Sequence, residues 1–231
     1  MILCPVSASE RAYCREGVSL GIRGDGRTPT DHRPITVELG VLQNVNGSAH
    51  LCIGSHTDVI AGVKAQITEP PAANPGNGIV DISIECAPSL FVDMHSRRED
   101  VNSELDNAVK QILHAALPLS SLCVMPGRFA WHIYIDVIVL AVDGNILEAV
   151  SCAIWAALVD TRLPLLVPVR AEAGFKDDFS LELSDGSEVK LATNDLPIYV
   201  TLARIGGKYI VDATQHEEAC STSRVHFAVD R

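Results

Sequence analysis

The residues best suited to chemistry lie in a strand–turn–helix sequence near the middle of the chain. Ile133–Val142 is rich in β-branched residues and carries one charge, so it predicts a strand buried on both faces. Asp143-Gly144-Asn145 follows and supplies residues that tolerate left-handed turn geometry. Such a turn opens a helix N-terminus, where unpaired N–H groups and the helix dipole favour an anion. The turn is therefore a candidate anion-binding site.

A second candidate is the pair Arg97 and Arg98, within Ser96-Arg97-Arg98-Glu99-Asp100. Adjacent arginines before a helix are typical of a solvated helix entrance, and they also suit a contact with phosphate. Spacing alone leaves both interpretations open.

Metal and redox motifs are missing from the sequence. The seven cysteines include no C-x-x-C pair, and the eight histidines follow no H-E-x-x-H or H-x-x-E-H spacing. We therefore expect buried free thiols in a reducing compartment, no metal site and no cofactor.

The sequence begins without a signal-peptide pattern and contains no long apolar run, so we expect a soluble, intracellular protein without membrane contact.

Overall charge limits the classes of partner. The 231 residues carry 29 acidic and 18 basic side chains, a net charge of −11. This balance argues against a free-standing nucleic-acid binder but allows a small basic patch, or a basic channel that other subunits complete. A hydrophobic fraction of 47% predicts one large packed domain or two small ones.

The helices and strands that position these residues can be predicted from the periodicity of hydrophobic residues and from turn-forming residues. From Ile146 the pattern predicts a helix that is apolar almost all round and therefore lies inside a layered fold. Two further helices are predicted, over 8–16, with a capping box from Ser7 to Glu10 and a stop at Gly17, and over 101–116. Predicted strands cover 35–42, 49–54, 59–67, 79–86, 122–124, 130–142, 163–169, 198–205, 209–212 and 225–229. The acidic stretch 171–196 predicts a hairpin of Phe179–Leu183 with Val189–Leu191.

In their order along the chain, these landmarks resemble the RNase PH superfamily, and within it the ring subunits of the RNA exosome. The resemblance rests on motifs that span nearly the whole chain: Asp25-Gly26-Arg27, Asp31-His32-Arg33-Pro34-Ile35, Gly40-Val41-Leu42, Asn46-Gly47-Ser48-Ala49, Gly62-Val63-Lys64-Ala65, Asp136-Val137, Asp143-Gly144-Asn145-Ile146-Leu147, Ala156-Ala157-Leu158, Thr161-Arg162-Leu163-Pro164, Val211-Asp212-Ala213-Thr214 and Glu217-Glu218-Ala219-Cys220.

The resemblance implies an α+β fold of the RNase PH type (ribosomal protein S5 domain 2-like), with mixed β-sheets packed against α-helices. We expect a single domain over 1–231, with an N-terminal helix and turn at 1–30. A first part spans 31–166 and a second part spans 190–231. Family members usually continue into a further strand and a long helix, which we expect this chain to lack after Arg231.

The resemblance also implies a test of activity at individual residues. Active relatives degrade the 3′ end of RNA with phosphate as the attacking group, and a Thr-Arg pair after the central strand grips that phosphate. The matching residues here are Ile146 and Leu147, whose side chains donate no hydrogen bond, so we expect the phosphate site to be lost at Leu147. Two carboxylates six residues apart in active members match Asp212 and Glu218, which we regard as vestigial catalytic candidates. Arg97 and Arg98 match an RNA-binding helix entrance.

We therefore expect a non-catalytic structural subunit of the exosome core ring, acting in 3′–5′ RNA processing and degradation, including rRNA maturation. Its expected partners are other RNase PH-like subunits in a six-membered ring, S1/KH-type cap subunits and single-stranded RNA. The expected location is the nucleus, with the nucleolus, and the cytoplasm. The alternative is an active phosphate-dependent 3′–5′ exoribonuclease whose phosphate is held by other residues, for example across a dimer interface. An unrelated metabolic enzyme lacks support, because no Walker, G-x-S-x-G or Rossmann motif is present.

Overall fold

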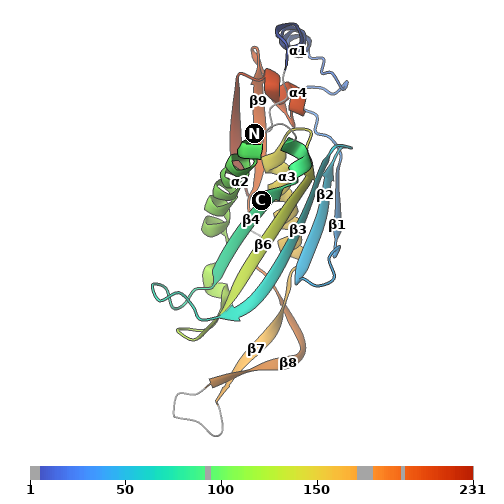
Figure 1. Cartoon of the computed structure of the whole chain (residues 1–231). Coiled ribbons are helices and arrows are strands. Elements are labelled where there is room, and N and C mark those ends of the chain that lie inside the picture. Colours follow the sequence, from blue (N-terminus) through green and yellow to red (C-terminus); the bar gives the residue numbers. More distant parts are fainter. Residues whose placement is uncertain (1–5, 92–94, 171–178, 194–195, 231) are drawn as a thin grey trace.

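The computed structural model describes residues 6–91, 95–170, 179–193 and 196–230, without the side chains of 95–97, 170, 179 and 183–186. Its elements, drawn in Figure 1, are α1 (Ala8–Leu20), β1 (Ile35–Leu39), β2 (Gly47–Ile53), β3 (Thr57–Thr68), β4 (Ile79–Cys86), η1 (Pro88–Phe91), α2 (His95–Ala116), η2 (Leu119–Leu122), β5 (Cys123–Met125), β6 (Phe129–Ala141), α3 (Ile146–Asp160), β7 (Arg162–Arg170), β8 (Phe179–Lys190), β9 (Ile198–Ile205), β10 (Lys208–Val211), α4 (Gln215–Cys220) and β11 (Ser223–Val229).

A mixed sheet of six strands forms the body of the molecule. Its order is β1-β2-β3-β6-β4, with β5 paired to β6 beside this path. The central strand β6 pairs antiparallel with β3 and parallel with β4. A three-stranded antiparallel sheet, β10-β9-β11, lies at one end, and the two-stranded ribbon β7–β8 projects from the other (Figure 1). The expected α+β fold with mixed sheets and helices is confirmed.

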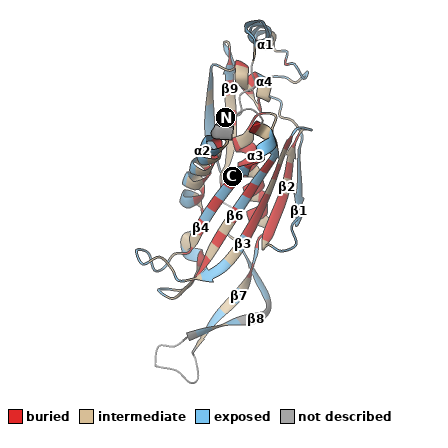
Figure 2. Cartoon of the chain, in the orientation of Figure 1, coloured by how far each residue is buried: buried red, intermediate tan, exposed pale blue. Residues whose placement is uncertain are grey.

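The large sheet has one covered face and one face open to solvent. Helix α3 packs on β2 and β3, and α2 packs on β4. Burial therefore alternates along β6 (Figure 2). Its outward residues Ile138 and Leu140 are 48% and 41% exposed. The prediction that this strand is buried on both faces is wrong, because β-branched residues also occupy its outer face, where no described helix covers them.

Helix α3 is the layer between the two sheets. It packs against β2 and β3 on one side and against β9 on the other. Small residues allow this close approach, since Ala149, Ala153 and Ala157 have no exposed surface. The C-terminal end of α3 comes so near to β2 that a Cβ at Gly47 would overlap the backbone oxygen of Ala157. The prediction of an interior apolar helix beginning at Ile146 is confirmed.

Several predicted boundaries need correction. Helix α1 has the predicted capping box but continues through Gly17 to Leu20, and Gly21 in left-handed geometry ends it. The predicted hairpin over 179–191 is wrong: Phe179–Lys190 is one strand, β8, paired antiparallel with β7. Residues 171–178 and 194–195, which carry four of the acidic side chains of the stretch 171–196, lie outside the described part of the chain. None of the described helices is long and apolar enough to cross a membrane.

Candidate functional site

The predicted anion site at the turn before α3 is built by two residues with positive φ. Gly144 has φ +76°, and a Cβ there would overlap the backbone of Ala213 and Gln215. Asn145 has φ +55° and is the N-cap of α3, although its side chain does not cap the helix. The turn is thus packed directly against the segment that follows β10, and the strand–turn–helix prediction is confirmed.

Asp212 directly follows β10 and lies at the centre of a buried ionic network. Its side chain has no exposed surface, and its own φ is +47°. Arg33 binds it with two guanidinium nitrogens, Nε at 2.8 Å from Oδ2 and Nη2 at 2.7 Å from Oδ1, and with its backbone N–H. Arg27 donates to Oδ2 at 2.8 Å, and Asn145 donates to Oδ1 at 3.1 Å. Both carboxylate oxygens are therefore occupied by protein donors.

A second arginine–carboxylate pair lies beside the first. The Arg23 guanidinium binds both oxygens of Glu217, at 2.9 and 2.6 Å, and also donates to the backbone oxygen of Asp212. Arg23 is 2% exposed and Glu217 is 5% exposed. The residues 23–33 are thereby attached to the end of β10 and to α4 through charge-assisted hydrogen bonds, which are stronger than neutral ones.

The charge state of Asp212 follows from this environment. Burial by itself raises the pKa of the carboxyl group, but the hydrogen bonds and charge of Arg33, with the charge of His32, reverse that effect and hold the pKa well below its usual range. Asp212 is therefore an anion that stays paired inside the protein. A catalytic acid must exchange a proton and a metal ligand must offer a free oxygen, and this carboxylate does neither in the observed arrangement.

Glu218 occupies the place at the α3 N-terminus that an external anion would take. Its Oε1 accepts the backbone N–H of Asn145 at 2.7 Å, and its Oε2 accepts from Arg224 at 3.1 Å. Burial raises the pKa of Glu218, and the hydrogen bond from Asn145 opposes that rise. The N–H of the N-cap residue and the positive end of the helix dipole thus already meet a carboxylate of the chain itself.

A cavity of about 140 Å³ opens beside this carboxylate, between α2, α3 and β11. Ile146 and Leu147 line it with apolar side chains, and Leu147 is 9% exposed. These are the positions that match the phosphate-binding Thr-Arg pair in the family resemblance. Among the described lining residues Arg224 is the one permanent cation, and it pairs with Glu218. His226 also lines the cavity, and burial followed by the charge of Arg224 lowers its pKa. The cavity wall is largely apolar.

The predicted RNA-binding pair lies elsewhere. Arg97 and Arg98 are in the first turn of α2; Arg98 is half-buried, and the side chain of Arg97 lies outside the described part. Their role in RNA binding stays a prediction, as does the vestigial catalytic role of Asp212 and Glu218.

Sequence reasoning missed the residues that hold Asp212. Arg27 and Arg33 were noted only as parts of motifs, and Asn145 only as a turn residue. Arg33 and Asp212 are 179 positions apart, so no local period links them. The available signal was three arginines within 23–33, a segment with Gly and Pro in which no helix or strand is predicted.

Replacing Asp212 by Asn should destabilise the fold strongly. The substitution keeps the shape but removes the buried charge that Arg33 and Arg27 bind, leaving Arg33 with the more distant Asp143 at 3.2 Å. Breaking such a buried pair costs about 3–5 kcal/mol. Urea unfolding followed by circular dichroism measures this change. Glu188→Gln is the control, because it removes an exposed partner of Arg162 at 3.8 Å and should cost less than about 1 kcal/mol. Equal effects of the two substitutions would contradict the assigned role of Asp212.

His32 should make stability depend on pH. Its Nε2 lies 2.6 Å from Glu148, and this hydrogen bond raises the pKa of His32 against the opposing effect of burial, with further help from Asp212. A raised folded-state pKa stabilises the fold below the unfolded value of about 6.5 and loses that contribution as pH rises through the folded pKa.

The difference in unfolding free energy between the natural chain and His32→Gln should therefore shrink as pH rises from about 6 to 9. Urea unfolding at each pH measures it, with His56→Gln as a control for an exposed imidazole. A constant difference across this range would show that the proton on His32 is not linked to folding.

Comparison with known proteins identifies the family of the chain. Residues 31–164 match the model of the 3′ exoribonuclease family, domain 1, and residues 195–231 match domain 2 of the same family. An exosome complex component Rrp42 of Methanocella arvoryzae is 33% identical over 95% of this chain and 80% of its own length. That of Thermococcus kodakarensis is 33% identical over 91% of this chain and 75% of its own.

Solved structures agree with the sequence matches. The chain superposes on a subunit of the Archaeoglobus fulgidus exosome with RNA bound to the active site, with a TM-score of 0.79 and 28% identity over 96% of this chain and 83% of that one. An archaeal exosome core gives a TM-score of 0.76 with the same identity, over 96% and 81%. The chain therefore belongs to the RNase PH family of 3′ exoribonucleases and is similar to its Rrp42 exosome ring subunits.

Proposed function

We propose that this chain is a non-catalytic structural subunit of an RNA exosome core ring. In this role it pairs with another RNase PH-like subunit, completes a six-membered ring that carries S1/KH-type cap subunits, and helps to line a channel for single-stranded RNA. The ring acts in 3′–5′ RNA processing and turnover, including rRNA maturation, in the nucleus and nucleolus and in the cytoplasm. Similarity to Rrp42 exosome components supports the place in the ring.

The loss of catalysis is supported chiefly by the carboxylate of Glu218 at the α3 N-terminus. Phosphorolysis needs a phosphate ion held by cations or N–H donors. Here the N–H of Asn145 is bonded to Glu218, and Leu147 lies where a phosphate-binding arginine is expected. A charge-assisted hydrogen bond to phosphate is worth about 1.5–3 kcal/mol. The loss of two such bonds therefore lowers a rate by about two to four powers of ten.

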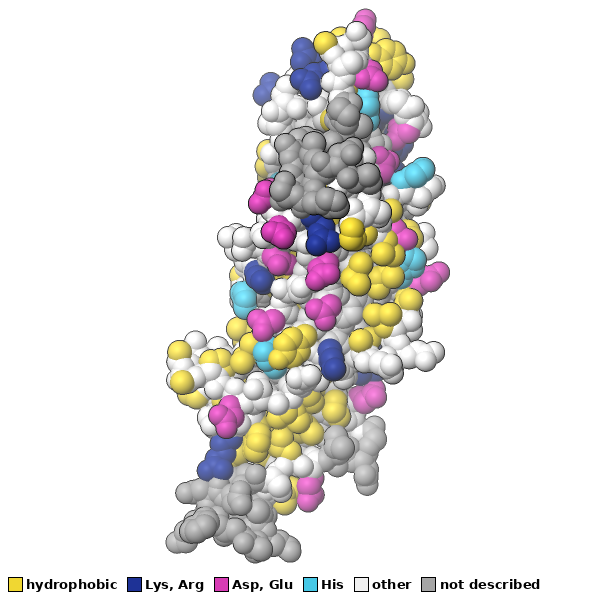
Figure 3. Space-filling model, viewed as in Figure 1, with side chains coloured by type: hydrophobic (Ala, Val, Ile, Leu, Met, Phe, Trp, Pro, Cys, Tyr) yellow, Lys and Arg dark blue, Asp and Glu magenta, His cyan; other side chains and the backbone are white. Residues whose placement is uncertain are grey.

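A ring position is supported by the surface of the large sheet. Edge strand β1 is exposed along its whole length, including Ile35, Val37 and Leu39, each at least 43% exposed. Figure 3 shows hydrophobic side chains gathered among charged ones over the solvent-facing side of this sheet. Exposed strand edges and apolar surface of this kind fit a chain whose neighbours cover them.

The alternative function, an active phosphate-dependent exoribonuclease, is favoured by one feature. A carboxyl group whose pKa is raised by burial, beside an arginine and a histidine in a cavity, suits general acid–base catalysis. The same cavity gives RNA phosphates little to bind, because Arg224 is paired with Glu218. We therefore favour the structural role.

A phosphorolysis assay separates the structural role from an activity that the chain carries by itself. The purified chain, incubated with 3′-labelled RNA, inorganic phosphate and Mg²⁺, should release no nucleoside diphosphate, and Glu218→Gln should not change that result. A catalytically active RNase PH protein is the positive control. Release by the chain alone, abolished in the Glu218→Gln variant, would establish the alternative.

In an assembled ring, replacing both Arg97 and Arg98 by Ala should reduce RNA crosslinking and lower its dependence on salt, while assembly stays unchanged. Loss of two phosphate contacts reduces the slope of log affinity against log salt by about one to two. The matched control replaces Arg11 and Arg15, which are exposed on α1. Unaltered crosslinking would return Arg97 and Arg98 to the role of a solvated helix entrance.

A further inference from the structure

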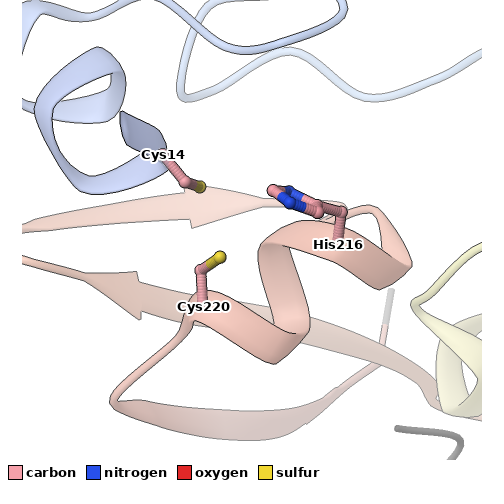
Figure 4. Close-up of side chains that lie close together, drawn as sticks. All are labelled: Cys14, His216 and Cys220. Carbon is pink, nitrogen blue, oxygen red and sulfur yellow. The ribbon is translucent and has the colours of Figure 1, made fainter. Parts of the chain in front are cut away.

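Three metal-ligating side chains meet where α1 packs on α4, away from the cavity described above. Cys14 comes from α1, and His216 and Cys220 come from α4, where their spacing of four residues places them on one face. The two sulfurs and a ring nitrogen of the histidine all lie within 4.8 Å of one another. Figure 4 shows the three side chains directed toward a common point.

We propose that Cys14, His216 and Cys220 form a zinc site that fastens the N-terminal helix to α4, independently of the role proposed in the exosome. Two thiolates and one imidazole are a ligand set that Zn²⁺ prefers. With Zn–S near 2.3 Å and Zn–N near 2.0 Å, ligand atoms of a tetrahedral site lie roughly 3.3–3.8 Å apart. The three ligand atoms lie within 4.8 Å of one another, so zinc binding requires them to approach one another slightly.

The surroundings leave room for a fourth ligand. His216 is exposed, and Cys14 and His216 line a cavity of about 370 Å³. Glu217 lines the same cavity, but Arg23 already holds both of its carboxylate oxygens. We assign water as the fourth ligand of the proposed site, since the other carboxylates that line this cavity, Asp25 and Asp143, are also bonded to arginines. When Zn²⁺ binds, it displaces the protons of the two thiols, and these protons pass to solvent. His216 binds the metal as a neutral imidazole.

Helix α1 is the element that the proposed zinc site would stabilise. Val18 is its one buried residue, and it joins a small cluster with Ala203, Ile205 and Ile210 that is separate from the main core. Tyr13 and Leu20 on the same helix are 77% and 71% exposed. So small an apolar contact holds a helix weakly, and a metal bridge to α4 adds a strong local attachment.

Another group, His50, Cys52 and Asp58, also has ligand atoms within reach of one another. There the histidine is already bonded to Asp58 at 2.6 Å, and the set offers one sulfur in place of two. Zn²⁺ prefers the thiolate-rich group. Cys52→Ser is therefore a matched control, since it removes a half-buried thiol from the competing group.

The test is a Co²⁺ titration of the full chain, reduced and freed of metal, with Zn²⁺ used to displace the cobalt. We expect one equivalent of Co²⁺ to bind with a thiolate-to-cobalt charge-transfer band, and Cys52→Ser to behave like the natural chain. Cys14→Ser and His216→Gln should each weaken binding by at least about tenfold. Hydrogen exchange should slow in α1 when Zn²⁺ is added, and not in Cys14→Ser.

Three results would overturn the site. One is the absence of a charge-transfer band. Another is a band that survives in both Cys14→Ser and His216→Gln, or that disappears in Cys52→Ser. The third is a Cys14–Cys220 disulfide, seen by mass spectrometry without reductant, in a chain whose reduced form binds no metal. Because no step uses RNA or phosphate, failure of this site leaves the proposed exosome role untouched.

Discussion

The pairing of the buried carboxylate of Asp212 with Arg33 and Arg27 is the interaction on which the rest of the structure depends. It joins the N-terminal residues 23–33 to the end of β10, and Asn145 extends it to the turn before α3. Breaking such a buried pair costs about 3–5 kcal/mol, a large share of the 5–15 kcal/mol that stabilises a typical domain. The two sheets and the helix between them are thus connected by charge as well as by apolar packing.

The same network decides what the turn before α3 can do. A helix N-terminus with two residues of positive φ before it suits an anion, and this chain supplies one internally, Glu218. Leu147 adds apolar surface where the family resemblance implies a phosphate-binding arginine. The two side-chain N–H groups of Asn145 bind Asp212 and Glu148, while its Oδ1 is buried without a partner in the described structure. The turn therefore connects α3 to the segment that follows β10 and to α4.

Local features were predictable from the sequence and distant ones were not. Both boundaries of strand β4, the capping box of Ser7 and the start of α3 at Ile146 agree with the prediction. These features follow from hydrophobic periodicity and from turn-forming residues, which act between neighbours in the sequence. The exposed face of β6 was missed, since composition does not reveal which face a helix covers. Pairings between remote segments were missed too. Cys14 and Cys220 follow no metal motif, because the fold alone brings the two ends of the chain together.

A double-mutant cycle between Arg33 and Asp212 tests the central role of this ion pair most directly. Arg33→Met removes the side chain that binds both oxygens of Asp212, and Asp212→Asn removes the carboxylate that two nitrogens of Arg33 bind. After either change the other residue has less to lose, so the double variant should be more stable than the sum of the two single losses predicts. We expect a coupling free energy of about 2–3 kcal/mol from urea unfolding. Additive losses, within about 0.5 kcal/mol, would show that the two side chains act independently and that the fold does not depend on their pairing.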